Sequence, residues 1–103
     1  MTYEVVLTDT VRDAIEAQIL FYKEEGVALD VISNWLAKLM QRIEDLYEMP
    51  HRYPISEIVT AVSGLETRRL NHGENALYYR VDEKAKRVEI IAFRHGRRRP
   101  GLG

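Results

Sequence analysis

His95 is the side chain best suited to chemistry in this sequence of 103 residues. A neutral imidazole near pH 7 can take the proton of a ribose 2'-hydroxyl while that oxygen attacks the adjacent phosphate. The alternative is that His95 ends a strand and binds backbone groups there. Because His51, His72 and His95 lack the spacing of a metal site and the chain has no cysteine, we expect no metal and no cofactor.

A run of three arginines, Arg97 to Arg99, follows this histidine. Most such runs are simply solvated, but arginine side chains can also neutralise phosphates or pair with carboxylates. The run lies in the basic half of the chain: residues 51–103 hold 11 Lys/Arg and 6 Asp/Glu, whereas residues 1–50 hold 4 and 10. We therefore expect an anionic or acidic partner to dock on the second half.

The composition predicts a single folded domain over residues 1–103. Hydrophobic residues make up 46% of the chain and charged residues 30%, which is typical of globular proteins. The sequence contains no apolar run long enough to cross a bilayer, and its first residues do not resemble a secretion signal. A cytoplasmic location without a membrane partner is expected.

The acidic half predicts a short strand, residues 3–8, and two amphipathic helices. Thr10 and Asp13 have the spacing of a capping box at the start of the first helix, and Gly26 is placed to end it. The second helix is expected to run to Met49, because Pro50 disfavours helical geometry in the residue before it. The two helices should form an antiparallel hairpin, held to the rest of the domain by Tyr22, Trp35 and Tyr47.

The basic half predicts three strands, at residues 67–70, 76–81 and 88–93, after an irregular connection over residues 51–64. In the last strand Val88, Ile90 and Ala92 alternate with Glu89, Ile91 and Phe93, so both of its faces are partly apolar and the strand should be central. The fold class is therefore α+β with two layers. The N-terminal strand and an antiparallel meander form one sheet, the helical hairpin covers one face, and the other face is open.

Three segments of the basic half resemble the RelE/ParE superfamily of toxins from type II toxin–antitoxin systems: residues 66–70, 76–82 and 88–98. Tyr-Arg-Val-Asp at 79–82 and His-Gly-Arg-Arg at 95–98 are the most recognisable parts. The order and length of the predicted elements also resemble the family, including a hairpin that ends between Leu46 and Pro50. The resemblance covers the whole chain and implies a RelE/ParE-like fold.

The resemblance implies one of two activities. ParE-like members inhibit DNA gyrase without a substrate of their own, and Arg97, Arg98 and Arg99 resemble the segment on which they depend. RelE-like members cut mRNA on the ribosome without a metal; here His95 would be the base, and Arg69 and Arg80 would hold the phosphate. This catalytic set is incomplete because no tyrosine follows Tyr79, and a net charge of -1 favours gyrase over ribosomal RNA as the target.

The resemblance also implies a cognate antitoxin, whose disordered C-terminal segment folds when it contacts the toxin. A toxin–antitoxin hetero-oligomer is therefore expected. A protein that keeps this fold and only antitoxin binding is a third possibility. The expected antitoxin contacts are the four arginines of the predicted strands and their ends: Arg68, Arg69, Arg80 and Arg94.

Overall fold

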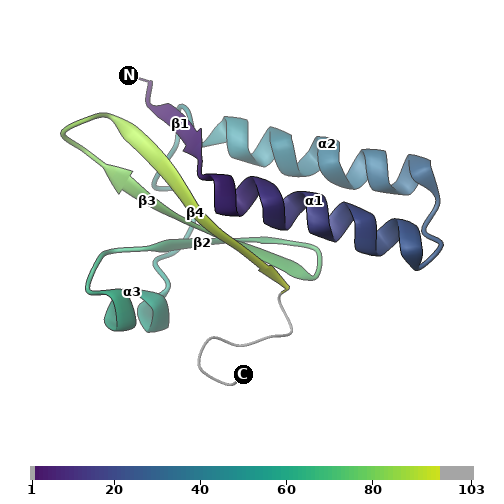
Figure 1. The fold of residues 1–103 in the computed structure, drawn as a ribbon. Helices are drawn as coiled ribbons and strands as arrows, with labels where there is room; N and C mark the ends of the chain where they lie inside the picture. Colours follow the sequence, from purple (N-terminus) through teal and green to yellow (C-terminus); the bar gives the residue numbers. More distant parts are fainter. Residues whose placement is uncertain (1, 96–103) are drawn as a thin grey trace.

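The computed structural model describes residues 2–95, which form a two-layer α+β domain (Figure 1). The elements in chain order are β1 (Glu4–Leu7), α1 (Asp9–Glu24), α2 (Leu29–Asp45), α3 (Glu57–Ser63), β2 (Arg68–His72), β3 (Asn75–Asp82) and β4 (Arg87–His95). The sheet has the order β1-β4-β3-β2. β1 runs parallel to β4, and the other neighbours are antiparallel. The predicted fold class and the central place of the last strand are confirmed.

The helical hairpin of α1 and α2 covers one face of the sheet (Figure 1). Gly26 lies between the helices with φ 81°, a left-handed conformation that costs glycine little, as the sequence predicted. Each core side chain that this packing removes from water contributes about 1.5–3 kcal/mol. The core joins Val11 and Ile15 of α1 and Leu39 and Ile43 of α2 to strand residues Leu70, Leu77, Tyr79, Val88, Ile90 and Phe93.

The first helix begins earlier than the predicted capping box. Thr8 is the N-cap: its hydroxyl oxygen accepts a hydrogen bond from the Val11 amide at 3.4 Å. The same hydroxyl donates to the Ile90 carbonyl of β4 at 3.2 Å. The prediction based on Thr10 and Asp13 is therefore wrong, because Thr8 caps the helix and also bonds it to the sheet.

The second helix ends at Asp45, several residues before Pro50. Tyr47 therefore lies beyond the helix with 48% of its surface exposed, and its predicted place in the core is wrong. Trp35 does hold the hairpin to the sheet: its ring centroid lies 5.4 Å from that of Tyr22 and 6.0 Å from that of Phe93 in β4.

A β-bulge in β4 changes the predicted alternation of its side chains. Tyr78 pairs with Ala92 and Tyr79 with Ile90, so Ile91 is an extra residue between two paired positions. The bulge lets both Ile90 and Phe93 face the hairpin, where both are buried. The prediction that Ile91 and Phe93 share a face is thus wrong, since simple alternation holds only in a strand without a bulge.

The connection predicted to be irregular contains α3, which begins after Ser56 and ends before Gly64. The Ser56 hydroxyl accepts a hydrogen bond from the Val59 amide at 3.4 Å, and Gly64 ends the helix with φ 75°. α3 lies on the side of the sheet opposite the hairpin (Figure 1). The face that we expected to be open is therefore partly covered.

Candidate binding face of the sheet

The sheet face that is turned away from the hairpin gathers arginine, aromatic and aliphatic side chains from three strands. Arg69 pairs with Tyr78, and Tyr78 pairs with Ala92, so these three lie in one row across β2, β3 and β4. The Arg69 guanidinium lies 5.6 Å from the centroid of the Tyr78 ring, a cation–π distance. The register of the three strands brings this row together, because directly paired residues point to the same face.

A hollow of about 380 Å³ separates α3 from this face of the sheet, and we call it the α3 groove. Its volume lies in the range of about 300–1,000 Å³ that is usual for binding pockets. None of the lining residues is acidic, and most are apolar: Ile58, Val59, Val62, Ser63, Tyr78, Arg80, Ile91, Ala92 and Arg94.

Hydrogen bonds to Thr67, at the start of β2, hold α3 in place. The Thr60 hydroxyl accepts a hydrogen bond from the Thr67 amide at 2.9 Å, and the Ser56 amide donates to the Thr67 carbonyl at 2.8 Å. The buried Thr67 hydroxyl donates to the Leu65 carbonyl at 2.9 Å. No residue of α3 itself is buried. Polar contacts rather than apolar packing therefore fix this helix.

Arg80 and Arg94 supply the positive charge of the α3 groove. The Arg80 Nε donates to the Thr67 hydroxyl oxygen at 3.2 Å, which directs this guanidinium along the sheet toward the base of α3. Arg94 is exposed near the end of β4. The groove thus combines apolar walls with two cations, as a site for an amphipathic acidic ligand requires.

Arg68 lies apart from the other three arginines that the sequence proposed as antitoxin contacts. Its partner across the strands is Tyr79, whose side chain is in the core beneath the hairpin. The Arg68 guanidinium donates to the His51 carbonyl at 3.2 Å and to the Tyr53 carbonyl at 2.7 Å. Arg68 therefore anchors the connection between α2 and α3, and the structure brings only Arg69, Arg80 and Arg94 to the common face.

His95 lies on the hairpin side of the sheet rather than beside the α3 groove. Its strand partner is Asn75, whose amide donates to the Tyr22 hydroxyl of α1 at 3.3 Å. The His95 Nε2 lies 3.3 Å from a carboxylate oxygen of Glu74. Arg80 pairs with Glu89, six residues before His95 on β4, which is about 20 Å along the strand. The structure thus does not bring His95 together with Arg69 and Arg80.

The other two histidines have structural partners. His72 is buried, its Nε2 lies 2.9 Å from the Trp35 carbonyl oxygen, and burial lowers its pKa. His51 lies 2.7 Å from the Glu83 carboxylate. Within residues 2–95 no group of three or more potential ligands (His, Cys, Asp or Glu) is placed to hold a metal ion.

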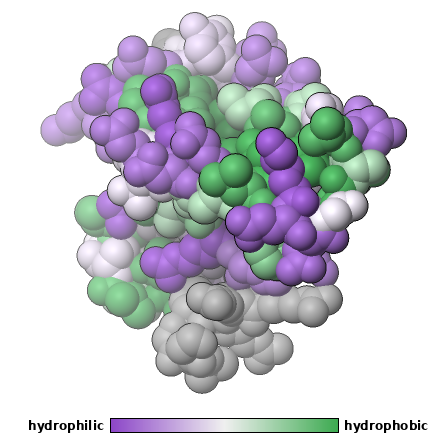
Figure 2. All heavy atoms as spheres, turned by 45° about the vertical axis from the view of Figure 1, so that its right-hand side comes forward, coloured by the Kyte–Doolittle hydropathy of each residue, from purple (hydrophilic) through white to green (hydrophobic). Residues whose placement is uncertain are grey.

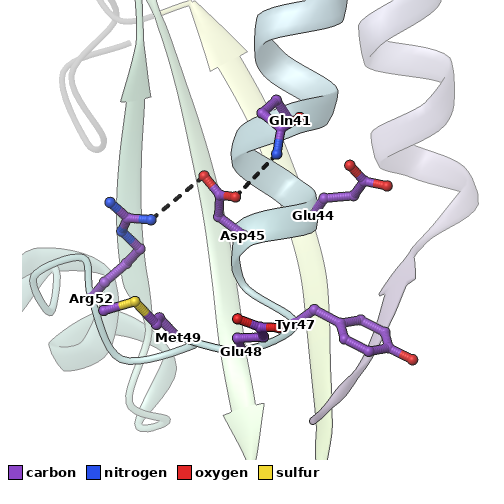
Figure 3. Close-up of a pocket in the computed structure, with 7 residues that line it drawn as sticks. All are labelled: Gln41, Glu44, Asp45, Tyr47, Glu48, Met49 and Arg52. Carbon is purple, nitrogen blue, oxygen red and sulfur yellow. Dashed lines mark hydrogen bonds and ion pairs between the residues drawn. The ribbon is translucent and has the colours of Figure 1, made fainter.

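A second hollow, of about 410 Å³, lies at the end of α2. Figure 3 shows the Gln41 amide and the Arg52 guanidinium pointing to the carboxylate of Asp45, at 3.1 and 3.5 Å. The Tyr47 ring points away from these groups (Figure 3). Because the carboxylate of Asp45 and the guanidinium of Arg52 already pair with each other, these two charged groups of the hollow are less available to a ligand.

Exposed apolar side chains also occur near the turn of the helical hairpin. Leu20 and Phe21 near the end of α1 and Leu29 and Val31 near the start of α2 are all about half exposed or more. Figure 2, which brings this side forward, shows a broad hydrophobic area among charged residues. The described chain therefore has apolar surface on both sides of the sheet, and the α3 groove combines such surface with a concave shape and two arginines.

Arg97, Arg98 and Arg99, the proposed target-binding residues, lie outside the described residues. Among residues 2–95, no helix is long and apolar enough to cross a membrane.

Comparison with known proteins identifies the family. A model described as the ParE toxin of the type II toxin–antitoxin system parDE matches residues 5–100. The chain belongs to this ParE toxin family. A toxin of this family is expected to share its fold with related toxin–antitoxin proteins, and one solved structure shows this similarity.

That structure is a chain of the RelBE2 toxin–antitoxin complex from Mycobacterium tuberculosis. It is 20% identical to this ParE-family chain and has a TM-score of 0.59. The match covers 92% of the present chain and 99% of the other. No curated protein sequence matches. The structural similarity supports the RelE/ParE-like fold of this toxin.

The sequence did not reveal the part that α3 plays in this face. Ile58 and Val62 lie in a stretch whose type was ambiguous, and Thr67 was assigned only to a strand. Ser56 and Gly64, a helix-capping residue and a helix-ending residue on either side of an apolar stretch, were the signal that would have predicted the helix.

Proposed function

We propose that this member of the ParE toxin family inhibits DNA gyrase and is neutralised by a cognate antitoxin. The observation that carries the proposal is the family match over residues 5–100, which includes Arg97, Arg98 and Arg99. These arginines would form charge-assisted contacts with phosphates or carboxylates of the gyrase–DNA complex. The toxin would stall gyrase on cleaved DNA and would convert no substrate.

The competing function is cleavage of ribosome-bound mRNA. It requires a base and phosphate-binding cations within reach of one phosphate, and general bases act at hydrogen-bond distance. His95 lies on the hairpin side of the sheet, whereas Arg69 and Arg80 belong to the opposite face. This separation favours the gyrase proposal.

Two findings support an antitoxin partner. The family is that of parDE, a toxin–antitoxin system, and the similar chain was solved in a toxin–antitoxin complex. The described face of the sheet offers Arg69, Arg80 and Arg94 for the carboxylates of such a partner. We propose a hetero-oligomer of the two proteins in which these charges are covered.

Two assays on the purified chain test the target. In the first, gyrase, ATP and supercoiled plasmid are incubated with the chain, and detergent releases any cleaved DNA. Accumulation of linear plasmid in proportion to the chain is the expected result. In the second, primer extension maps breaks in an mRNA that is being translated. Breaks in the mRNA without linear plasmid would replace the gyrase proposal by the endonuclease.

A further inference from the structure

We propose that the tip of the helical hairpin is the docking surface for the chain's own basic tail, with the arginines of the tail on the carboxylates of the tip. The hairpin tip comprises residues 20–31, which are the end of α1, the turn at Gly26 and the start of α2. The basic tail comprises residues 96–103, which follow β4 and lie outside the described residues. The contact itself does not depend on a target, whereas its consequence for toxicity rests on the proposed inhibition of gyrase.

The hairpin tip carries apolar side chains that the described elements leave uncovered. Four of them are about half exposed or more: Leu20, Phe21, Leu29 and Val31. The turn that carries them is fixed by the chain itself, because the Val27 amide donates a hydrogen bond to the Tyr22 carbonyl at 3.0 Å. The tip is therefore a preformed surface with apolar side chains to cover.

The hairpin tip also carries three carboxylates, those of Glu24, Glu25 and Asp30, against one lysine, Lys23. All three acidic residues are exposed, and within residues 2–95 none of them forms an ion pair. Glu24 and Glu25 lie at the C-terminal end of α1, where the helix dipole disfavours negative charge. A cationic ligand at this end of the helix would remove that unfavourable interaction.

β4 ends beside this surface. The Phe93 ring lies beneath α2, with its centroid 6.0 Å from that of Trp35. His95 follows two residues later on the same face of the sheet, and its strand partner Asn75 donates to the Tyr22 hydroxyl at 3.3 Å. Tyr22 belongs to the hairpin tip. The basic tail therefore starts below the tip, on the hairpin side of the sheet.

The basic tail is long enough to reach the carboxylates. An extended chain spans about 3.3–3.6 Å per residue, so residues 97–99 begin roughly 7–14 Å from His95 before their own side chains are counted. Glu24 and Glu25 follow Tyr22 closely, at about 3–4.5 Å along the helix axis. The arginines can thus reach both carboxylates, and Leu102, up to roughly 25 Å along an extended chain, can reach the apolar side chains of the tip.

Covalent attachment makes a weak contact sufficient. An exposed ion pair strengthens a contact by at most about fivefold. However, a segment that is tethered by a few residues has an effective concentration in the millimolar range, far above that of a separate molecule. The arginine side chains add the possibility of paired hydrogen bonds to one carboxylate. The tail of the same chain is therefore the favoured occupant of the tip.

Two other arrangements are less favourable. A contact between the tips of two copies would bring the three carboxylates of each copy together, and like charges repel. The α3 groove is a poorer seat for the basic tail, because its lining residues include Arg80 and Arg94 and no carboxylate. Charge complementarity thus assigns the tail to the hairpin tip.

The contact would hold Arg97, Arg98 and Arg99 on the toxin's own surface until a target displaces them. On the proposed function, these are the arginines that meet gyrase or its DNA. Removing the carboxylates of the hairpin tip should therefore lower the concentration of toxin that is needed to trap cleaved DNA.

Limited digestion of the purified chain with trypsin tests the contact, because the basic tail must leave the tip to be cut after Arg97 or Arg98. The tip variant combines Glu24→Gln with Glu25→Gln. The control variant combines Asp13→Asn with Glu16→Gln, which removes the same charge from exposed positions earlier in α1. Thermal melts check folding, and mass spectrometry follows the loss of the tail at low and at high salt.

We expect the tip variant to lose the basic tail about fivefold faster than the wild-type chain at low salt, the effect of losing two exposed ion pairs. The control variant should stay within about twofold of the wild-type chain. High salt should bring the wild-type chain to the rate of the tip variant, because screening weakens ion pairs between exposed groups. Equal rates for the wild-type chain and the tip variant at low salt would overturn the proposal.

Two further measurements separate this contact from its alternatives. Protection of the tail that increases with protein concentration would assign the contact to another copy and overturn docking within one chain. In the gyrase assay, the tip variant should give the same amount of linear plasmid at a lower concentration than the wild-type chain, and equal concentrations would overturn the role of the contact in toxicity. If neither chain gives linear plasmid, the proposed inhibition of gyrase fails, while the trypsin rates still decide whether the tail docks on the tip.

Discussion

Tyr79 and Arg68 are paired across β2 and β3, and both side chains donate hydrogen bonds to the connection between α2 and α3. The Tyr79 hydroxyl donates to the Pro50 carbonyl at 2.7 Å, while Arg68 donates to the carbonyls of residues 51 and 53. Burial raises the pKa of Tyr79 to about 12, so its phenol stays protonated and remains a donor throughout the neutral range. This one pair of residues thus holds the connection between α2 and α3 in place.

Replacing the Tyr79 phenol tests this anchor. Tyr79→Phe keeps the ring in the core but leaves the buried Pro50 carbonyl without its donor, and we expect a loss of about 1–3 kcal/mol in the free energy of unfolding. Urea denaturation measures the change. Tyr47→Phe, at an exposed tyrosine, is the control and should be neutral. Equal stability of the two variants would show that the connection does not depend on this bond.

His95 separates the two proposed targets at the level of one side chain. His95→Gln removes the proton acceptor, so an endonuclease that uses it should lose roughly 10²-fold or more in single-turnover cleavage. Because His95 lies on the hairpin side beside Glu74, we expect growth arrest to be unchanged in this variant at equal expression. A variant that folds but no longer arrests growth would point back to the endonuclease.

At the scale of elements, the placement of α3 against the sheet shows what a single sequence does not reveal. A helix of seven residues is too short to be stable alone, and none of its residues is buried, so it depends on Thr67. No local pattern marks the partner of a hydrogen bond made across the fold. The hairpin and the meander were predictable because their periodicity extends over many residues, whereas the bulge at Ile91 interrupts such a pattern.

The hydroxyl of Thr67 is the group on which the orientation of Arg80 beside α3 can be tested. Thr67→Val keeps the shape of this buried side chain but removes the hydroxyl that bonds the Leu65 carbonyl and the Arg80 Nε. We expect a loss of about 1–3 kcal/mol in stability, and weaker antitoxin binding because Arg80 loses its orientation. Thr10→Val, at an exposed position of α1, is the control for both measurements.

The turn between β3 and β4 contains a cluster of polar contacts around Glu83. Its carboxylate accepts hydrogen bonds from the Tyr3 hydroxyl at 2.9 Å and from Lys86 at 3.3 Å, and it lies 2.7 Å from His51. The bond from Tyr3 is the main cause that lowers the pKa of Glu83 below its usual 4.5. The turn is thereby linked to β1 and to the connection before α3.

This cluster predicts a dependence of stability on pH. A carboxyl group whose pKa is lowered by folding stabilises the native state above its unfolded pKa, and this contribution disappears as the pH falls through the lower, folded value. Glu83→Gln should therefore lower the melting temperature at pH 7 slightly and reduce its fall between about pH 5 and pH 3. Melting curves of the variant and the wild-type chain, measured in parallel over this pH range, test the prediction. An equal fall in melting temperature for both chains would contradict it.

At the scale of the whole molecule, the two halves of opposite charge have separate structural roles. The acidic half supplies β1 and the helical hairpin, and the basic half supplies α3 and the rest of the sheet. The sequence predicted this division. Its resemblance to the toxin family also implied Arg68, Arg69, Arg80 and Arg94 as antitoxin contacts, and the structure places Arg69, Arg80 and Arg94 on one face of the sheet. The sequence did not predict the detachment of Arg68 from that group, which follows from hydrogen bonds to a distant connection.

The separate roles of the two halves lead to a prediction for residues 97–103. Residues 97–103 comprise three arginines, two glycines, one proline and a single leucine, so they offer little apolar surface to bury. Deleting them should leave cooperative melting intact, because the hairpin and the sheet already form a hydrophobic core among the described residues. If the antitoxin binds to the described face of the sheet as proposed, its binding should also survive the deletion.

Toxicity should not survive. If the three arginines make charge-assisted contacts with gyrase or its DNA, each is worth about 1.5–3 kcal/mol when well paired, and the loss of all three weakens binding by a factor of roughly a thousand or more. Growth arrest and the amount of gyrase-cleaved DNA should therefore both fall in the truncated chain, with melting and antitoxin pull-down as controls. If the truncated chain folds, binds its antitoxin and still arrests growth fully, the three arginines do not make the contact with gyrase. The exposed apolar side chains of the hairpin then become the next candidates for that contact.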